Sequence, residues 1–300
     1  MSRIRLPLPS DFSFDGAVRS HGWYDLPPFS YDREGGTLTT SVGLPLLSLG
    51  KEEDAANAGQ SRAASLTFAV RGGRLEAESD SLDGLSLARV ARRVFSLDVS
   101  LEEFTRTIGG EPRLAQALAQ GRGRFLRGPT LFEDAVKMLL TTNCSWAATK
   151  GMVVRLIAET GAEGRAFPDP EAVAALGASK LKSKIRCGYR AESLARFARR
   201  VSRGKLDLTR WERPGVPAEE ARAAILAERG FGPYAAEGLL RILGRHDFLA
   251  IDSWVRQEYR RRRPGPPDTT DRAIARRYAR YGAHRGLALW LDMTSHWHTP

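Results

Sequence analysis

The chain has 300 residues, a net charge of +11 and only two cysteines, which are too few for a disulfide framework or for a four-cysteine zinc or iron–sulfur site. No apolar run approaches the ~20 residues that a membrane-spanning helix needs. The polar N-terminus lacks a signal-peptide core, so we expect a soluble protein in the cytoplasm. A chain of this length can form two or three domains.

The charge is distributed unevenly. Residues 1–100 hold 11 Lys and Arg against 13 Asp and Glu, whereas residues 101–300 hold 35 against 22. The second part therefore carries a net charge of +13, which favours a polyanionic partner. Solvated basic faces on arginine-rich helices are the alternative.

The first part of the chain has the pattern of strands. Residues 37–42 and 65–70 are rich in β-formers, and a Gly-Gly turn leads into the alternating segment 74–78. We predict a small antiparallel β domain over residues 1–85, with a loop at 51–62.

A helical period begins near residue 85 and continues to the end of the chain. Residues 87–95 and 101–108 each predict a helix, and Thr130 to Glu133 form a capping box before a longer apolar helix. The fold class is therefore predicted as α+β, with residues 86–300 mainly helical.

Residues 224–241 predict two helices joined by the tight hairpin Gly230-Phe231-Gly232. Two glycines one residue apart allow a sharp turn and a close approach to a ligand. Pro233 suits a first helical position, and free amides at this helix start would suit a phosphate. Asp252, 18 residues after Tyr234, stands where an aspartate often caps a helix.

A helix, a Gly-Phe-Gly hairpin, a second helix and a downstream aspartate resemble the helix-hairpin-helix DNA glycosylase superfamily, in its 8-oxoguanine and 3-methyladenine branch without an iron–sulfur cluster. Three further segments follow in family order: the turn at Asn143, the Gly-Tyr-Arg-Ala segment at 188–191, and a closing helix at 282–290. The resemblance covers residues 85–300 and, more weakly, the N-terminal sheet. It implies two helical subdomains and a loop, residues 20–29, that reaches the base pocket.

The resemblance also assigns roles. An enzyme that acts on a base in duplex DNA must extrude the nucleotide and fill the gap. Gly230 and Gly232 would bind a backbone phosphate. No cofactor is expected apart from a structural monovalent cation at the hairpin. Tyr189 would be the wedge and Asn143 the gap-filler. Further DNA contacts are predicted at Arg190, Arg186 and Lys184.

Asp252 is the predicted catalytic residue, because a carboxylate stabilises the positive sugar that forms when an N-glycosidic bond breaks. Tyr234 stands where strand-cleaving relatives have a lysine that forms a Schiff base. Tyrosine cannot do so, and the resemblance therefore implies a monofunctional glycosylase. Lys137 is the alternative lysine.

The base pocket is predicted from Tyr234, Gly238, Trp146 and Leu289. Residues that give 8-oxoguanine enzymes their selectivity are replaced by Ala148, Gly238 and Leu289. An aromatic pocket that is roomy at Gly238 favours alkylated purines of the 3-methyladenine type. An oxidised or bulky modified base is the alternative.

The expected partner is double-stranded DNA with a damaged or modified base, bound by a monomer in base excision repair and near the nucleoid if the source is prokaryotic. A non-catalytic helix-hairpin-helix DNA-binding protein and an RNA-binding helical protein are the competing interpretations. The five histidines show no metal-ligand spacing, so no metal site is expected. Residues 260–267 read as a basic loop.

Overall fold

The computed structural model describes residues 1–44, 62–263 and 270–298. Its N-terminal part is a five-stranded sheet in the order β1-β5-β4-β3-β2, with every neighbouring pair antiparallel. The strands are β1 Ser2–Pro7, β2 Ser30–Asp32, β3 Thr37–Gly43, β4 Ala63–Arg71 and β5 Arg74–Ser79. The three predicted strands are confirmed, and β1 and β2 are additional. The predicted loop at 51–62 lies, apart from Arg62, outside the described residues.

One face of the sheet is apolar because inward side chains alternate along each strand. Leu38 of β3 pairs in register with Phe68 of β4, and both are fully buried. Helix α2 (Gly84–Val94) begins at the N-cap Asp83 and lies against β1 and β5. The predicted change from strands to helices near residue 85 is therefore the start of α2.

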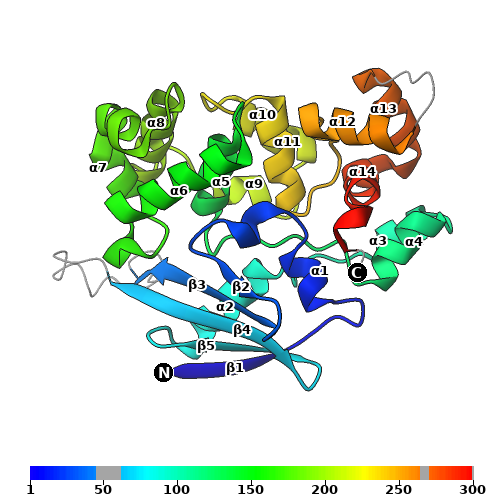
Figure 1. Cartoon of the computed structure of the whole chain (residues 1–300), viewed down its shortest axis with the longest axis horizontal. Helices are drawn as coiled ribbons and strands as arrows, with labels where there is room; N and C mark the ends of the chain where they lie inside the picture. The colour runs from blue at the N-terminus through cyan, green and yellow to red at the C-terminus, as the bar shows by residue number, and fades with distance from the viewer. Residues whose placement is uncertain (45–61, 264–269, 299–300) are drawn as a thin grey trace.

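Helices α5 to α8 and α10 to α13 form a row along the side of the molecule opposite to β1, as Figure 1 shows, whereas α2 lies at the sheet. The remaining helices are α1 Phe14–Val18, α3 Glu102–Thr107, α4 Pro112–Ala119, α5 Leu131–Thr141, α6 Trp146–Thr160, α7 Pro170–Lys180, α8 Arg190–Ser202, α9 Thr209–Glu212, α10 Ala218–Leu226, α11 Pro233–Ile242, α12 Ser253–Arg262, α13 Asp271–Tyr278 and α14 Arg285–Met293. Short 3-10 turns lie at Gly22–Asp25 (η1), Ala162–Gly164 (η4), Ala279–His284 (η6) and Ser295–His298 (η7), and a π-turn (η5) at Leu181–Ile185. Within the described ranges, no helix is both long enough and apolar enough to cross a bilayer.

Two hydrophobic clusters organise the packing. The first joins the sheet to α1, α2 and the helices α5 to α11. The second joins α3 and α4 to α12, α13 and α14, which follow more than 100 residues later in the chain. The second cluster contacts residues 20–29, which we call the N-terminal loop. The ring centroids of Phe125 and His21 lie 5.7 Å apart there. The two predicted helical subdomains correspond to the helices of these clusters.

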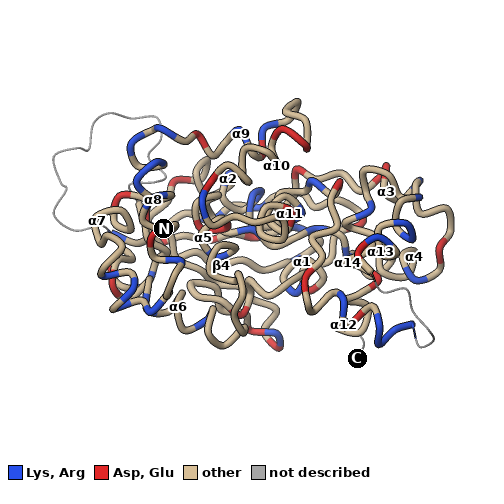
Figure 2. Tube along the Cα trace, turned by 90° about the horizontal axis from the view of Figure 1, so that it is seen from above, with Lys and Arg blue, Asp and Glu red and all other residues tan. Residues whose placement is uncertain are grey.

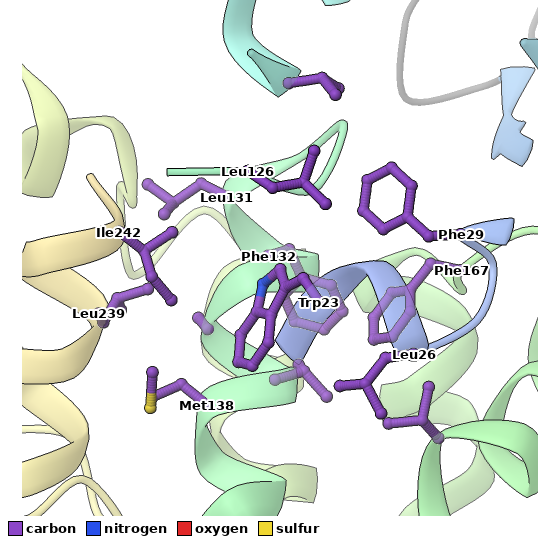
Figure 3. Close-up of a cluster of buried hydrophobic side chains, with 14 of the residues drawn as sticks. Trp23, Leu26, Phe29, Leu126, Leu131, Phe132, Met138, Phe167, Leu239 and Ile242 are labelled. Atoms are coloured by element: carbon purple, nitrogen blue, oxygen red, sulfur yellow. The ribbon is translucent and has the colours of Figure 1, made fainter. Parts of the chain in front are cut away.

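Buried charges tie the N-terminal loop to α5. Asp134 accepts hydrogen bonds from Trp23 Nε1 (2.9 Å) and the Gly128 amide (2.7 Å), and Arg93 bridges it to Glu212. Figure 3 shows Trp23 of η1 beside Phe132 of α5, with Leu26, the residue after η1, in the same cluster. One turn along α5, Lys137 pairs with Glu133 at 2.5 Å and lies 5.0 Å from the centroid of the Phe29 ring. Burial raises the pKa of the Glu133 and Asp134 carboxyl groups.

We expect Glu133→Ala to destabilise the protein by about 3–5 kcal/mol, because it leaves the Lys137 ammonium buried without its partner. Urea denaturation would measure the free energy of unfolding. Glu220→Ala is the control: its partner Arg210 is exposed, and the loss should stay below about 1 kcal/mol. Equal losses in the two variants would show that Lys137 is compensated by other groups.

Candidate functional site

The predicted hairpin between α10 and α11 is present, and its two glycines have different structural roles. Gly230 has φ +100°, and a Cβ there would come within 2.7 Å of Ser193 and 2.8 Å of Leu139, so only glycine fits. Phe231 is buried between Phe197 and Trp211 and anchors the hairpin in the first cluster. Gly232 is exposed, caps α11 and has open space around its Cα. The hairpin is thus anchored in the core by Phe231, whereas Gly232 at the start of α11 faces solvent.

Asp252 is the N-cap of α12, as predicted. Its Oδ1 accepts a hydrogen bond from the Val255 amide at 2.7 Å. The backbone before it is fixed by a relay, in which Arg222 holds Glu237 (2.8 Å) and Glu237 Oε2 accepts from the Ala250 amide (3.0 Å). Ala250 has φ +49°, a left-handed conformation that a non-glycine residue adopts only when its surroundings impose it. The carboxylate is therefore held in place by α11.

Tyr234 lies in the first turn of α11, close to Asp252. Burial and the Asp252 charge raise the pKa of Tyr234, so its phenol stays protonated at neutral pH. One turn further along the same face is Gly238, and Arg241 follows at the next turn. Sequence reasoning missed Arg241, which is buried and stacks on Trp290, with its Cζ 4.1 Å from the ring centroid. The helical spacing 234, 238, 241 was the available signal.

The predicted gap-filler and wedge come together. Asn143, in the turn after α5, has φ +46° and its Nδ2 donates to the Tyr189 hydroxyl at 3.2 Å. Both side chains are exposed, Tyr189 to 64%. An aromatic ring this exposed on a structured turn suits contact with a partner.

Arg190, predicted as a DNA contact, is instead buried beneath this pair. Its guanidinium donates to the Thr142 carbonyl and hydroxyl oxygens and lies 4.6 Å from the centroid of the Tyr189 ring. It therefore positions the Asn143 turn and does not present its charge at the surface. Arg186 and Lys184 are exposed, and Lys184 pairs with Glu159 at 2.7 Å.

The structure gives the surroundings of the other three residues predicted to line the base pocket. Trp146 is 39% exposed, donates to Asp25 at 2.9 Å and lies over Gly22, so it closes the N-terminal loop onto α6. The space in front of Gly238 is filled by Met138, whose Cε lies 3.1 Å from an ideal Cβ. Leu289 is buried within the second cluster.

Basic residues flank α11 on both sides. Seen from above in Figure 2, Lys and Arg positions mark α7 and α8 on one side of α11 and α12 and α13 on the other. The predicted basic loop is in part wrong: Arg260 to Arg262 belong to α12, Arg261 and Arg262 pair with Glu258, and residues 264–267 lie outside the described residues. The predicted closing helix begins only at Arg285, since Gly282 with φ +52° interrupts it. In the described residues, His, Cys, Asp and Glu form no cluster that suits a metal ion.

No family model and no curated protein sequence matches the chain. Solved structures do match it. The 3-methyladenine DNA-glycosylase from Archaeoglobus fulgidus superposes with a TM-score of 0.71 at 20% identity, over 100% of this chain and 99% of that one. The 8-oxoguanine glycosylase/lyase of Clostridium acetobutylicum gives 0.71 at 16% identity, over 98% and 96%. Its complex with DNA containing cytosine opposite 8-oxoguanine gives 0.67 at 14%, over 95% and 93%.

The chain has the fold of these DNA glycosylases. The likeness extends over the N-terminal sheet as well as the helices, because the coverage is nearly complete for both neighbours. The glycosylase fold thus places the Gly230–Gly232 hairpin, Asp252 and the Asn143 turn on the helical side of the molecule.

Two buried histidines beside the site predict how stability depends on pH. Burial lowers the pKa of His21 and of His246 to about 3. The unfolded chain binds these protons near pH 6.5, so stability is lost as pH falls from about 6.5 toward 3. At pH 5 we expect a loss of about 2 kcal/mol per histidine relative to neutral pH. Urea denaturation at both pH values would measure it, and a His21→Gln, His246→Gln double variant should show a smaller dependence. An equal dependence in both proteins would contradict this origin.

Proposed function

We propose that the chain is a monofunctional DNA glycosylase, which extrudes a modified base from duplex DNA and hydrolyses its N-glycosidic bond. The position of Asp252 carries this proposal: its carboxylate caps α12 directly beside the hairpin helix α11, with Oδ1 used by the cap. Solved structures with the same fold include a 3-methyladenine DNA-glycosylase and an 8-oxoguanine glycosylase/lyase.

Asp252 would act on the sugar. When the bond between C1′ and the base nitrogen breaks, the electron pair leaves with the base and the sugar becomes an oxocarbenium ion. A carboxylate held close to C1′ stabilises this charge electrostatically and orients the water that adds to C1′. Rigid placement matters for such stabilisation, and the relay from Arg222 through Glu237 to the Ala250 amide provides it.

Extrusion of the base would use the pair Asn143 and Tyr189. An aromatic ring can stack at the position that the base leaves, and an amide can hydrogen-bond to the base left opposite. The exposed Arg186, Lys182 and Lys184 lie in the segment just before Tyr189 and favour duplex DNA as the partner. The exposed amides at the start of α11 suit a backbone phosphate, with or without a monovalent cation held by the hairpin carbonyls.

Tyr234 and Lys137 support hydrolysis without strand cleavage. Tyr234 has no amine to form a Schiff base with the sugar. Lys137, the alternative lysine, is completely buried and paired with Glu133. It therefore lacks access to a nucleotide bound above α11. A monomer holds all the residues that this reaction requires.

Asp252→Asn should abolish base release by at least about 100-fold while DNA affinity is retained, because asparagine can still cap α12 but carries no charge. Single-turnover assays on duplexes with one lesion each, analysed with and without hot alkali, would measure it. Asp169→Asn is the matched control, since Asp169 caps α7 with the same 2.7 Å bond. Tight duplex binding without any release by the wild type would favour the non-catalytic binding protein.

Tyr189→Ala should slow release from a fully paired duplex more than release from a duplex in which the lesion is mispaired. The reason is that an unpaired base costs less to extrude, so the wedge matters less. The same single-turnover assay measures both rates. An equal loss on the two substrates would remove Tyr189 from the extrusion step.

A further inference from the structure

Arg241 is a buried cation without a hydrogen-bonding partner. Its side chain is 6% exposed, and within the described residues neither Nε nor Nη1 has a partner. Three other buried or partly buried arginines make hydrogen bonds or ion pairs with their guanidinium groups: Arg93 with Asp134 and Glu212, Arg127 with Asp98, and Arg190 with Thr142. Burial of an unpaired charge is costly, and an unsatisfied buried group in a folded protein calls for a cause. A ligand that completes its hydrogen bonds is such a cause.

The position of Arg241 on α11 indicates what kind of ligand its guanidinium would bind. Tyr234, Gly238 and Arg241 follow one another on the same face of α11, where Tyr234 is half-buried and Gly238 and Arg241 are buried. The charge of Arg241 interacts with that of Asp252, which agrees with a place beside the proposed catalytic carboxylate. The Trp290 ring, whose Nε1 donates to the Ser20 carbonyl, covers the guanidinium from the second cluster. Its unpaired donors therefore lie on the helix that carries Tyr234, beside the proposed catalytic carboxylate.

Two neighbours allow a planar base to approach. Met138 stands in front of Gly238, and its unbranched thioether can move aside at small cost. Trp290 holds the guanidinium by a cation–π contact and takes up no hydrogen-bond donor. Glu237, the other carboxylate near Arg241, is already held by Arg222 and the Ala250 amide.

We infer that Arg241 donates hydrogen bonds to a carbonyl oxygen of the extruded base, so that the substrate is a neutral, carbonyl-bearing base. This inference rests on the proposed glycosylase function and narrows it. The proposal differs from the sequence-based prediction of 3-methyladenine-type purines. Such bases are positively charged in DNA, and the positive guanidinium of Arg241 would repel them.

The chemistry of the leaving group gives the reason. When the bond between C1′ and nitrogen breaks, a neutral base takes the electron pair and departs as an anion, whose charge spreads onto its carbonyl oxygen. The guanidinium stabilises that charge as it develops, after which the base takes a proton from solvent and water adds to C1′. A cationic N-alkylpurine departs as a neutral molecule, and before departure Arg241 repels it.

Single-turnover release from five duplexes tests this. Uracil, hypoxanthine and 8-oxoguanine are neutral and carry a carbonyl group, 1,N6-ethenoadenine is neutral without one, and 7-methylguanine is cationic. We expect wild-type release of at least one base of the first group. Arg241→Met should slow that release by about 100-fold or more, the usual effect of losing a donor to a developing oxyanion. Arg241→Lys should recover part of the rate. Arg245→Met is the control, because Arg245 is bound to the Val216 and Arg213 carbonyls on the far side of α11.

A second readout separates leaving-group stabilisation from a structural role. If uracil is released, the ratio of 5-fluorouracil to uracil rates should rise in Arg241→Met, because the more acidic base needs less help to depart. For the purines, 7-methylguanine release should stay unchanged or rise in the same variant. A structural role would lower the melting temperature and slow all bases alike.

Three outcomes would overturn the inference: wild-type preference for 7-methylguanine or ethenoadenine, equal slowing of every base in Arg241→Met, or no slowing at all. Asp252→Asn, run beside it, separates this from the proposed function. If Asp252→Asn abolishes release and Arg241→Met shows no dependence on the base, only the inference about Arg241 fails. If the wild type releases none of the five bases, both fail.

Discussion

The buried ion pairs of α5 are the constraint on which the arrangement of the molecule depends. Asp134 satisfies Arg93 of α2, Trp23 of the N-terminal loop and the Gly128 amide at once, and Lys137 pairs with Glu133 one turn later. Because each buried charge must be matched, these contacts fix α2, the loop and α5 relative to one another. The Asn143 turn then follows directly from the end of α5, so its place is set by the same contacts.

Asp252, the proposed catalytic residue, is held in place in a similar way. Arg222, Glu237 and the strained Ala250 fix the approach to Asp252, and Arg190 fixes the turn that carries Asn143. In both cases an arginine fixes backbone atoms next to a functional candidate, Arg190 directly and Arg222 through Glu237. Rigid support of this kind suits a site in which charge must be stabilised without reorganisation.

Local patterns in the sequence predicted much of this fold. The strands at 37–43, 63–71 and 74–79, the hairpin glycines and the cap at Asp252 follow from alternation, turn chemistry and capping, which neighbouring residues determine. The strand β1 escaped prediction because its pairing partner β5 lies more than 60 residues later in the chain, and β2 escaped it because it has only three residues.

The base pocket could not be predicted in detail, because its walls come from different elements. Whether Gly238 leaves room depends on Met138 of α5, and whether Trp146 lines a pocket depends on Asp25 and Gly22. Arg190 reads as a surface residue in a basic segment until Thr142 is seen to accept its hydrogen bonds. A matched sequence motif identifies which residue stands at a position in the chain. The burial of that residue and its hydrogen-bonding partners depend on tertiary packing.

The second hydrophobic cluster has a consequence for how the protein is made. Its α3 and α4 are synthesised well before α12 to α14, which supply the rest of their core. During synthesis the apolar sides of α3 and α4 must therefore stay uncovered until the C-terminal helices leave the ribosome, an interval in which chaperones protect such surfaces. Asp252 belongs to the late part, so a nascent chain holds the Gly230–Gly232 hairpin before it holds this carboxylate.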